Sequence, residues 1–529
     1  MATLIIDNFQ GRLTRYKNGD INSGYAKYAT TFGNDPFSKP GDLTWFEVPT
    51  RIDSGGSVIT DLIMAARPRL ESNITYVYAI GHLGRLYKIQ VNDPSSNEPD
   101  HDNPVLLTTL TAESPTFKFG ASIEFFGDTE RLFIGHDRGV TRIDFNGTNE
   151  TFVGTQSNYT SGVPRPSEQF VGNLYFGDGD NIMQITSALT ATHDKLSPPL
   201  FVGTQVRDLD VSPDGNYLQI VSTRVTQADM TTATQDTDSL SSADSNLFLW
   251  NGIDIEATAR TPYNSYSLTA NETFGPFSYT MGYDLGGATI YTEGQKILSL
   301  PNSRAPNFKS MFSTGNLVGF ASPEHNDTTD VLEASMLVYG AYDLEIPQGL
   351  YRWFRLTAAT ETDVIQVPMS LIVSNLFFGS SSAGYTDNKI GSAKLYFSTH
   401  ETDSSPTSDF KLYRFTTVPT GADSAIAGVY ETQNQLFPQK MKIAEVRLYT
   451  DPIVTNNAFT IALIGSDGNI ITNSSKTFTA GTEVAVGEDL CKYSPVIEPT
   501  YAIGVRITNS GSVNMTFNKI EIDYAEGGR

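Results

Sequence analysis

Cysteine is almost absent from this chain of 529 residues, which contains only Cys491. A single thiol cannot close an internal disulfide, and it cannot supply the several thiolates of a cysteine-based zinc cluster. Histidine is also rare, and its positions match no metal-binding spacing. The six histidines are His82, His101, His136, His193, His325 and His400. We therefore expect no metal and no other cofactor.

Basic residues are also few in comparison with acidic residues. The chain has 36 Lys and Arg against 59 Asp and Glu, which gives a formal net charge of −23 at pH 7. Binding to a nucleic-acid backbone needs clustered basic residues, and so does binding to an anionic membrane surface. We expect neither, and we expect no sequence-specific binding of nucleic acid. An acidic surface instead keeps a protein soluble and limits non-specific association.

Long apolar runs and helical periodicity are missing. No stretch of about eighteen apolar residues is present, so we expect no membrane insertion. The opening MATLIIDNFQGRLTR carries Asp7 and has no sustained apolar core, which predicts no secretory signal and synthesis in a reducing cytoplasm. Apolar residues alternate with a period of two far more often than they follow the helical spacing. The sequence therefore predicts an all-β protein.

Motifs of familiar enzymes are absent. The chain contains no Gly-rich loop opening a helix, no P-loop and no Gly-x-Ser-x-Gly elbow. Ser212-Pro-Asp214-Gly215 and Ser466-Asp467-Gly468 share only the turn of a sialidase Asp box and lack its tryptophan. We predict that the protein is not an enzyme. We assign no catalytic, cofactor-binding or metal-binding residues, and the binding residues stay unknown.

Two loops group oxygen atoms that suit calcium. They are Asp178-Gly-Asp180-Asn181 and Glu98–Asn103, and neither has the spacing of an EF-hand. His82 and His136 follow glycine at equivalent corners of two similar segments. A histidine repeated in a Gly-His turn is more often a hydrogen-bonding group than a metal ligand. We expect a structural role for all of these groups.

What the chain does contain is a repeated unit of two short apolar strands joined by a tight corner. Tyr76–Val91 reads YVYAIGHLGRLYKIQV, and Leu132–Phe145 reads LFIGHDRGVTRIDF. Looser copies are LYFGDGDNIMQI from Leu174, YLQIVS from Tyr217 with LFLWNG from Leu247, ATIYTEGQKILSL from Ala288, MLVYGAYDLEIPQGLYRWFRL from Met336, and LYFSTH from Leu395 with FKLYRF from Phe410.

The spacing of these copies predicts a β-propeller of about seven blades. They recur at roughly 40–70 residues, which fits one four-stranded blade plus a variable loop. Propellers close with 4–8 blades, roughly the number of copies here. Four polar segments should project from the ring as loops: Asn92–Asn103, Gln227–Asn246, Glu324–Asp330 and Glu401–Asp409.

Three regions follow from the pattern. Residues 1–57 read as an irregular N-terminal arm, which packs on the propeller and supplies a strand to a blade or docks on a neighbouring subunit. Residues 58–421 carry the blades. Residues 422–529 have longer, strictly alternating strands joined by Gly-containing turns, which predicts a C-terminal β-sandwich of jelly-roll or immunoglobulin-like shape.

The opening residues IIDNFQGRLTRYKNGD, in an acidic, nearly cysteine-free all-β chain, resemble the starts of tail and neck structural proteins of tailed bacteriophages. Short-tailed phages have tail nozzle proteins that include a propeller, so the resemblance implies one at about residues 58–421. SPDGNYLQIVS from Ser212 resembles one blade of TolB-like or WD-like propellers. The resemblance lies in the general character of the sequence and does not extend residue by residue, so it assigns no functional residue.

We therefore expect a non-enzymatic virion structural protein, assembled in the host cytoplasm into the tail or neck. Its partners would be other virion proteins and copies of itself in a homo-oligomeric ring. One alternative is a receptor- or glycan-binding module that uses aromatics such as Tyr342, Tyr351 and Trp353. The other is a glycoside hydrolase, which would bring carboxylates together in the central pocket.

Overall fold

A computed structural model describes most of the chain, and every structural statement below concerns the described residues. They are residues 2–7, 9, 18–19, 28–32, 34–35, 42–45, 50–51, 59, 63–71, 74–90, 103–117, 120–127, 131–201, 203–224, 245–284, 287–300, 311–314, 317–326, 331–340, 350–356, 370–374, 394–400, 410–416, 428–509 and 515–526. Within them the structure has 40 strands and one 3-10 turn, η1 (Gln156–Asn158), so the predicted all-β class is confirmed.

Seven antiparallel four-stranded sheets account for most of the strands in the described ranges. They are sheet 1, with β7 (Ile63–Glu71), β8 (Ile74–Gly81), β9 (Arg85–Gln90) and β10 (Asn103–Thr109); sheet 2, with β11 (Ser122–Phe125), β12 (Arg131–His136), β13 (Gly139–Asp144) and β14 (Thr151–Phe152); sheet 3, with β15 (Ser167–Phe170), β16 (Asn173–Asp178), β17 (Asn181–Ile185) and β18 (Ala191–Thr192); sheet 4, with β19 (Gln205–Val211), β20 (Leu218–Thr223), β21 (Ser245–Trp250) and β22 (Ala259–Tyr263); sheet 5, with β23 (Ser267–Phe274), β24 (Phe277–Asp284), β25 (Gly287–Thr292) and β26 (Gln295–Leu300); sheet 6, with β27 (Met311–Thr314), β28 (Leu317–Asn326), β29 (Val331–Gly340) and β30 (Leu350–Leu356); and sheet 7, with β31 (Ser370–Ser374), β32 (Lys394–His400), β33 (Phe410–Thr416) and β6 (Thr50–Arg51).

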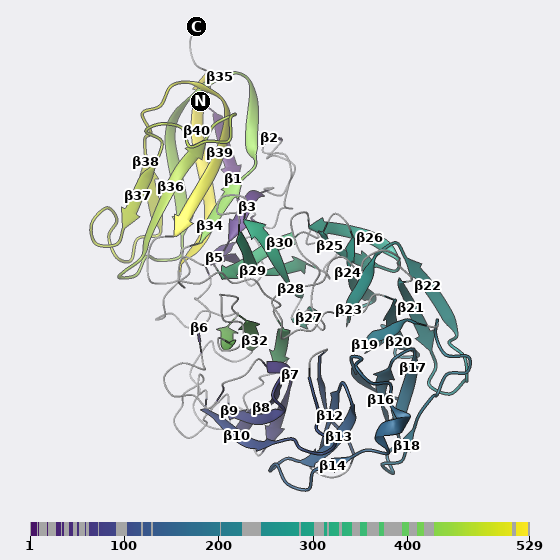
Figure 1. Ribbon diagram of the computed structural model, residues 1–529. Coiled ribbons are helices and arrows are strands. Elements are labelled where there is room, and N and C mark those ends of the chain that lie inside the picture. The colour runs from purple at the N-terminus through teal and green to yellow at the C-terminus, as the bar shows by residue number, and fades with distance from the viewer. Residues whose placement is uncertain are drawn as a thin grey trace.

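The sheets follow one another around a ring in a propeller-like arrangement (Figure 1). The first strand of each sheet contacts the first strand of the next, in the order β7, β11, β15, β19, β23, β27 and β31. The circle closes because β31 also contacts β7. These seven strands therefore form the inner wall of the ring.

The second strand of a sheet is buried on both faces. In β8, Tyr78 and Ile80 pack into a cluster shared with sheet 2, while Val77 and Ala79 between them pack into a separate cluster. In β16, Leu174 and Phe176 face sheet 2 and Tyr175 faces sheet 4. Because side chains alternate across a strand, a strand with a sheet on each side is apolar at successive positions. This explains the unbroken runs YVYAI and LYF.

The repeated sequence unit corresponds to the hairpin of the second and third strands in sheets 1, 2, 3, 4 and 7. Sheets 5 and 6 differ. The segments that begin at Ala288 and at Met336 form the third and fourth strands there, so in these two sheets the repeated unit covers the last hairpin. In sheet 5 a Glu-Gly corner at Glu293-Gly294, with both residues at positive φ, imitates the earlier Gly-containing corner.

The glycine that recurs in this unit has a packing role. A Cβ atom on Gly135 in β12 would lie 2.6 Å from Ser122 Oγ and 2.8 Å from the carbonyl oxygen of Arg165. A Cβ atom on Gly177 in β16 would lie 2.7 Å from Val206 Cγ1, on the first strand of sheet 4. Each glycine therefore lets the backbone or first strand of the next sheet approach closely.

The remaining strands form one twelve-stranded sheet, called here the terminal sheet. Its strands come from both ends of the chain: β1 (Ala2–Ile6), β2 (Asn18–Gly19), β3 (Tyr28–Phe32), β4 (Asn34–Asp35), β5 (Leu43–Trp45), β34 (Val429–Thr432), β35 (Asn434–Thr450), β36 (Ala458–Ile464), β37 (Lys476–Thr479), β38 (Leu490–Tyr493), β39 (Thr500–Asn509) and β40 (Thr516–Glu526). It lies beside sheet 6, where β3 and β4 contact β30 (Figure 1).

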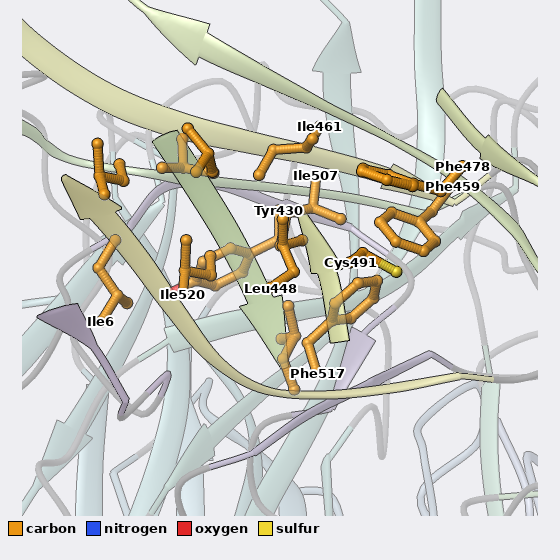
Figure 2. Close-up of a cluster of buried hydrophobic side chains, with 14 of the residues drawn as sticks. Ile6, Tyr430, Leu448, Phe459, Ile461, Phe478, Cys491, Ile507, Phe517 and Ile520 are labelled. Atoms are coloured by element: carbon orange, nitrogen blue, oxygen red, sulfur yellow. The ribbon is translucent and has the colours of Figure 1, made fainter. Parts of the chain in front are cut away.

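A single apolar cluster fills the terminal sheet. Figure 2 shows Ile6 from β1 in the same cluster as Phe459 from β36 and Phe517 from β40. The Phe459 ring stacks on Phe478 with centroids 5.3 Å apart and meets Phe517 edge-on at 5.1 Å. Strands from distant places in the pairing order share this cluster, so the sheet wraps around a common core. The predicted separation into two packed sheets stays a prediction.

The first residues of the chain take part in both structures. Ala2–Ile6 pairs with β40, and Thr50–Arg51 pairs with β33 as the fourth strand of sheet 7. Residues 1–57 therefore supply a strand that completes a four-stranded sheet, one of the two roles expected for the arm. The domain boundaries at residues 57 and 421 stay predictions.

Three of the predicted loops are shorter than expected. Asn103 begins β10, Ser245 and Asn246 begin β21, and Glu324–Asn326 extends β28 in a long hairpin with β29. Polar residues at a strand end still complete the hydrogen-bond ladder, so composition alone misplaced these limits. The rest of these loops, and all of Glu401–Asp409, lie outside the described residues.

The close approach at Gly135 leads to a first prediction. We expect Gly135→Ala to lower the free energy of unfolding by about 1–3 kcal/mol, the usual cost of overpacking a buried site. Thr151→Ala on exposed β14 of the same sheet should change it by less than about 0.5 kcal/mol. Chemical denaturation followed by tryptophan fluorescence measures both values. Equal losses at the two positions would contradict the packing role.

Candidate functional site

Charged side chains gather on the inner strands of the ring. Arg67 lies on β7, Glu124 on β11, Glu168 on β15, Asp210 on β19 and Glu272 on β23. The four carboxylates all act electrostatically on Arg67, and Glu124 acts most strongly. Five consecutive inner strands thus direct one guanidinium and four carboxylates toward a shared region. This group is called the inner charge cluster.

Glu124 is the best-connected member of this cluster. Its side chain is 1% exposed, and its Oε2 lies 3.0 Å from Arg67 Nη2. Ser167 Oγ and Gln169 Nε2 on sheet 3 both donate to the Glu124 carboxylate at 3.3 Å. One carboxylate on sheet 2 therefore joins sheets 1, 2 and 3.

Arg67 keeps a partly exposed side chain, at 39%. Glu124 raises the pKa of Arg67, burial opposes this effect, and Glu168, Glu272 and Asp210 raise it further. The guanidinium is therefore held firmly in its charged form. Its charge offsets part of the repulsion among carboxylates that the ring brings together.

A polar seam joins sheets 4 and 5 next to this cluster. Asp208 Oδ2 accepts a hydrogen bond from Asn271 N at 2.8 Å, and Asp210 Oδ2 accepts one from Thr273 N at 2.5 Å. Gln219 Oε1 accepts from Asn271 Nδ2 at 2.7 Å. Burial, with Glu272 nearby, raises the pKa of Asp210.

Chemically, a carboxyl group of raised pKa beside an ionised one is what a general acid and its partner require. Here, however, Glu124, Asp208 and Asp210 accept hydrogen bonds across sheet boundaries. Packing of neighbouring sheets alone accounts for their positions. Glu124, Asp208 and Asp210 therefore hold neighbouring sheets together.

His136 lies in a second buried polar group, where sheet 2 meets sheet 3. Its Nε2 is 3.0 Å from Thr141 Oγ1, and its Nδ1 accepts a hydrogen bond from Arg138 N at 3.3 Å. The side chain is fully buried. Burial lowers the pKa of His136 to about 3, with contributions from Arg165 and Arg138. As expected from the sequence, this histidine is a hydrogen-bonding group.

In the Asp178–Asn181 loop, whose oxygen atoms would suit calcium, Asp178 and Asn181 already have protein partners. Arg165, which is fully buried, donates from Nη1 to Asp178 Oδ1 at 2.6 Å, and Thr160 N donates to the same oxygen at 2.8 Å. Asn181 binds both the N and the O of Leu196 through its amide. Across the described residues no group of three or more His, Cys, Asp or Glu could hold a metal ion.

The structure also places other residues that the sequence analysis named. Ser212 Oγ donates to Asp214 Oδ1 at 2.5 Å in the turn between β19 and β20. Cys491 is buried in the terminal sheet, and burial raises the pKa of its thiol to about 11, so the thiol is unreactive at neutral pH. Tyr342 and residues 98–102 lie outside the described residues, as do the side chains of Tyr351 and Trp353.

Sequence reasoning missed Arg67 and Glu124. The available signal was a charged residue between two apolar residues of a short strand, as in Ser122–Phe125, which reads SIEF. A charge at such a position needs a partner, because burying an unpaired carboxylate is costly. The sequence does not say which distant strand supplies that partner.

Comparisons with known proteins identify no family for this chain. No protein-family model matches the chain, and no curated protein matches it in sequence. A chain of the mitotic checkpoint complex is 12% identical, with a TM-score of 0.39, over 70% of this chain and 95% of its own length. The extracellular domain of BT4673 from B. thetaiotaomicron is 10% identical, with a TM-score of 0.41, over 90% of this chain and 61% of its own. Neither likeness carries an argument about function.

In the ranges that the structure describes, no helix is long and apolar enough to cross a membrane.

The Arg67–Glu124 pair yields a second prediction. We expect Arg67→Gln to lower the free energy of unfolding by about 1–3 kcal/mol, less than the 3–5 kcal/mol of a fully buried pair because Arg67 is partly exposed. Arg131→Gln, in the more exposed pair with Asp144, should cost under about 1 kcal/mol. Adding Glu124→Gln to Arg67→Gln should recover part of the loss. Additive losses in this double-mutant cycle would show that the pair is not coupled.

Burial of His136 yields a third prediction. Its folded pKa of about 3 lies below the ordinary value of about 6.5, so its stabilising contribution is complete above pH 6.5 and is lost as the pH falls toward 3. In that window the free energy of unfolding should fall by about 1.4 kcal/mol per pH unit through this residue. His136→Gln should remove this component, as urea denaturation between pH 7 and pH 5 will show.

A matched control is His82→Gln at the equivalent corner of sheet 1, where the histidine is partly exposed. It tests whether any His-to-Gln change flattens the pH dependence. An unchanged slope in His136→Gln, with the protein folded, would remove His136 as its source.

Proposed function

We propose that the chain is a non-enzymatic structural protein of a tailed-bacteriophage virion, placed in the tail or neck through protein–protein contacts. The main support is the N-terminal segment, which contributes to both parts of the molecule. Its strand β1 pairs with β40 in the terminal sheet, and its strand β6 pairs with β33 in sheet 7. One segment thus links the ring to the terminal sheet. Such a link is what a rigid structural component of an assembly needs. The phage assignment itself rests on the resemblance of the opening residues.

The finer architecture belongs to the same proposal. We take the seven four-stranded sheets as the blades of a seven-bladed propeller over about residues 58–421. We take the terminal sheet as a sandwich of two layers that share the long strand β35, which pairs with both β39 and β40. A bulge between Leu436 and Met441 gives β35 the bend that such sharing needs.

A rigid apolar loop supports a role in protein contacts. Ile253 is 79% exposed and Ile255 is 64% exposed, in the loop between β21 and β22. Asn251 Oδ1 accepts hydrogen bonds from Ile253 N at 3.0 Å and Asp254 N at 2.9 Å, and Trp250 Nε1 donates to Asp254 O at 2.7 Å. Large apolar side chains on a fixed loop suit burial against a partner.

The experiment is the mass of the purified chain by light scattering and native mass spectrometry, alone and mixed with phage particles that lack it. We expect a defined ring or stable incorporation into the particles. Replacing Ile253 and Ile255 with Asp should reduce that association at least tenfold without changing the thermal midpoint. Val486→Asp, at a 55% exposed valine in the loop between β37 and β38, is the control. A monomer that ignores particles would contradict the proposal.

Glycoside hydrolysis is the second candidate, because Glu124, Glu168, Asp210 and Glu272 lie on inner strands of the ring and all act electrostatically on Arg67. Such an enzyme needs two carboxyl groups with separate roles beside its sugar. The test is release of reducing ends from a panel of bacterial polysaccharides. Turnover that Asp210→Asn abolishes in a folded protein would favour the hydrolase, and no turnover would leave the structural role.

A further inference from the structure

A small cleft opens in the terminal sheet where β40 begins. Its volume is about 120 Å³. It is lined by Asp451, Pro452, Val454, Asn457, Met515 and Thr516. The first four belong to the connection between β35 and β36, and the last two lie at the start of β40.

The walls of this cleft are fixed by backbone hydrogen bonds. Asp451 N donates to Thr516 O at 3.1 Å, which ties the connection to β40. Ile453 is 1% exposed, and its N and O bond to Glu488 O and Gly487 N, each at 2.8 Å. Val454 N donates to Asn457 Oδ1 at 2.8 Å. A ligand would therefore meet a preformed site and pay little ordering entropy.

The lining combines a few polar groups with apolar ones. Among the described residues that line the cleft, Asp451 supplies a carboxylate, and Asn457 and Thr516 supply an amide and a hydroxyl group. Pro452, Val454 and Met515 supply apolar surface. Asn518 lies behind the carboxylate, with its Nδ2 3.4 Å from Asp451 Oδ1, and its buried Oδ1 has no hydrogen-bond partner in the described residues.

This mixture favours a neutral ligand with several hydroxyl groups. Hydroxyl groups donate to a carboxylate and pair with an amide, while the C–H face of a sugar ring packs on apolar side chains. A hard cation such as calcium would need more oxygen ligands than one carboxylate and an amide provide. The volume is well below the roughly 300–1,000 Å³ of sites for drug-sized ligands, so one ring is the limit.

We propose that this cleft binds a single neutral pyranose residue of a glycan, with the Asp451 carboxylate accepting hydrogen bonds from its hydroxyl groups. The site would give a virion protein contact with a surface polysaccharide. It does not rest on the assembly role, because its position and chemistry are independent of the ring.

The test is saturation-transfer NMR on the full chain with glucose, galactose, mannose and N-acetylglucosamine as probes, and with putrescine as a cationic comparison. We expect at least one sugar to give saturable transfer. Val454 is 45% exposed, so Val454→Trp should fill the cleft without disturbing the core, and should weaken binding at least fivefold. Asp451→Asn should weaken it similarly.

Val486→Trp is the matched control, since Val486 is exposed on a nearby loop but does not line the cleft. It should leave sugar binding unchanged, and thermal midpoints of all three variants should confirm that they fold. No transfer to any of the four sugars, transfer to putrescine alone, or sugar binding that survives Val454→Trp would each overturn the proposal.

Discussion

The fold depends on one constraint: the second strand of a four-stranded sheet is apolar on both faces, so it cannot be covered by its own sheet. Tyr78 and Val77 are neighbours in β8, yet they pack into different clusters. A lone sheet would expose both of these faces to water, at a cost of about 25 cal/mol per Å² of apolar area. Only a neighbour on each side removes both costs, and a closed ring gives every sheet two neighbours.

Apolar packing brings the sheets together but does not fix how one slides against the next. The polar groups between sheets supply that specificity. Glu124 meets donors on two neighbouring sheets, and Asp208 meets the backbone of the following one. Buried charges of this kind add little net stability, because desolvation offsets most of their attraction, but a slipped register would leave them unpaired. Their clustering on the inner strands then needs no catalytic explanation.

The sequence could predict the class, the repeat and the approximate number of sheets, because alternation and glycine corners are local signals. It could not show that the copies at Ala288 and Met336 are hairpins of the third and fourth strands, because such a hairpin looks like one of the second and third. It could not predict the Arg67–Glu124 pair, since the two residues lie on different sheets. The recurrent glycine was visible, but its reason, contact with the next sheet, exists only in three dimensions.

The two parts of the molecule depend on one another through the start of the chain. Sheet 7 obtains its fourth strand from Thr50–Arg51, paired at only two positions. The strand before it, β5, ends at Trp45 and pairs with β40 of the terminal sheet. Loss of the terminal sheet would therefore release the segment that completes sheet 7. Because the ring and the terminal sheet share this segment, they should unfold as one cooperative unit, although each has its own core.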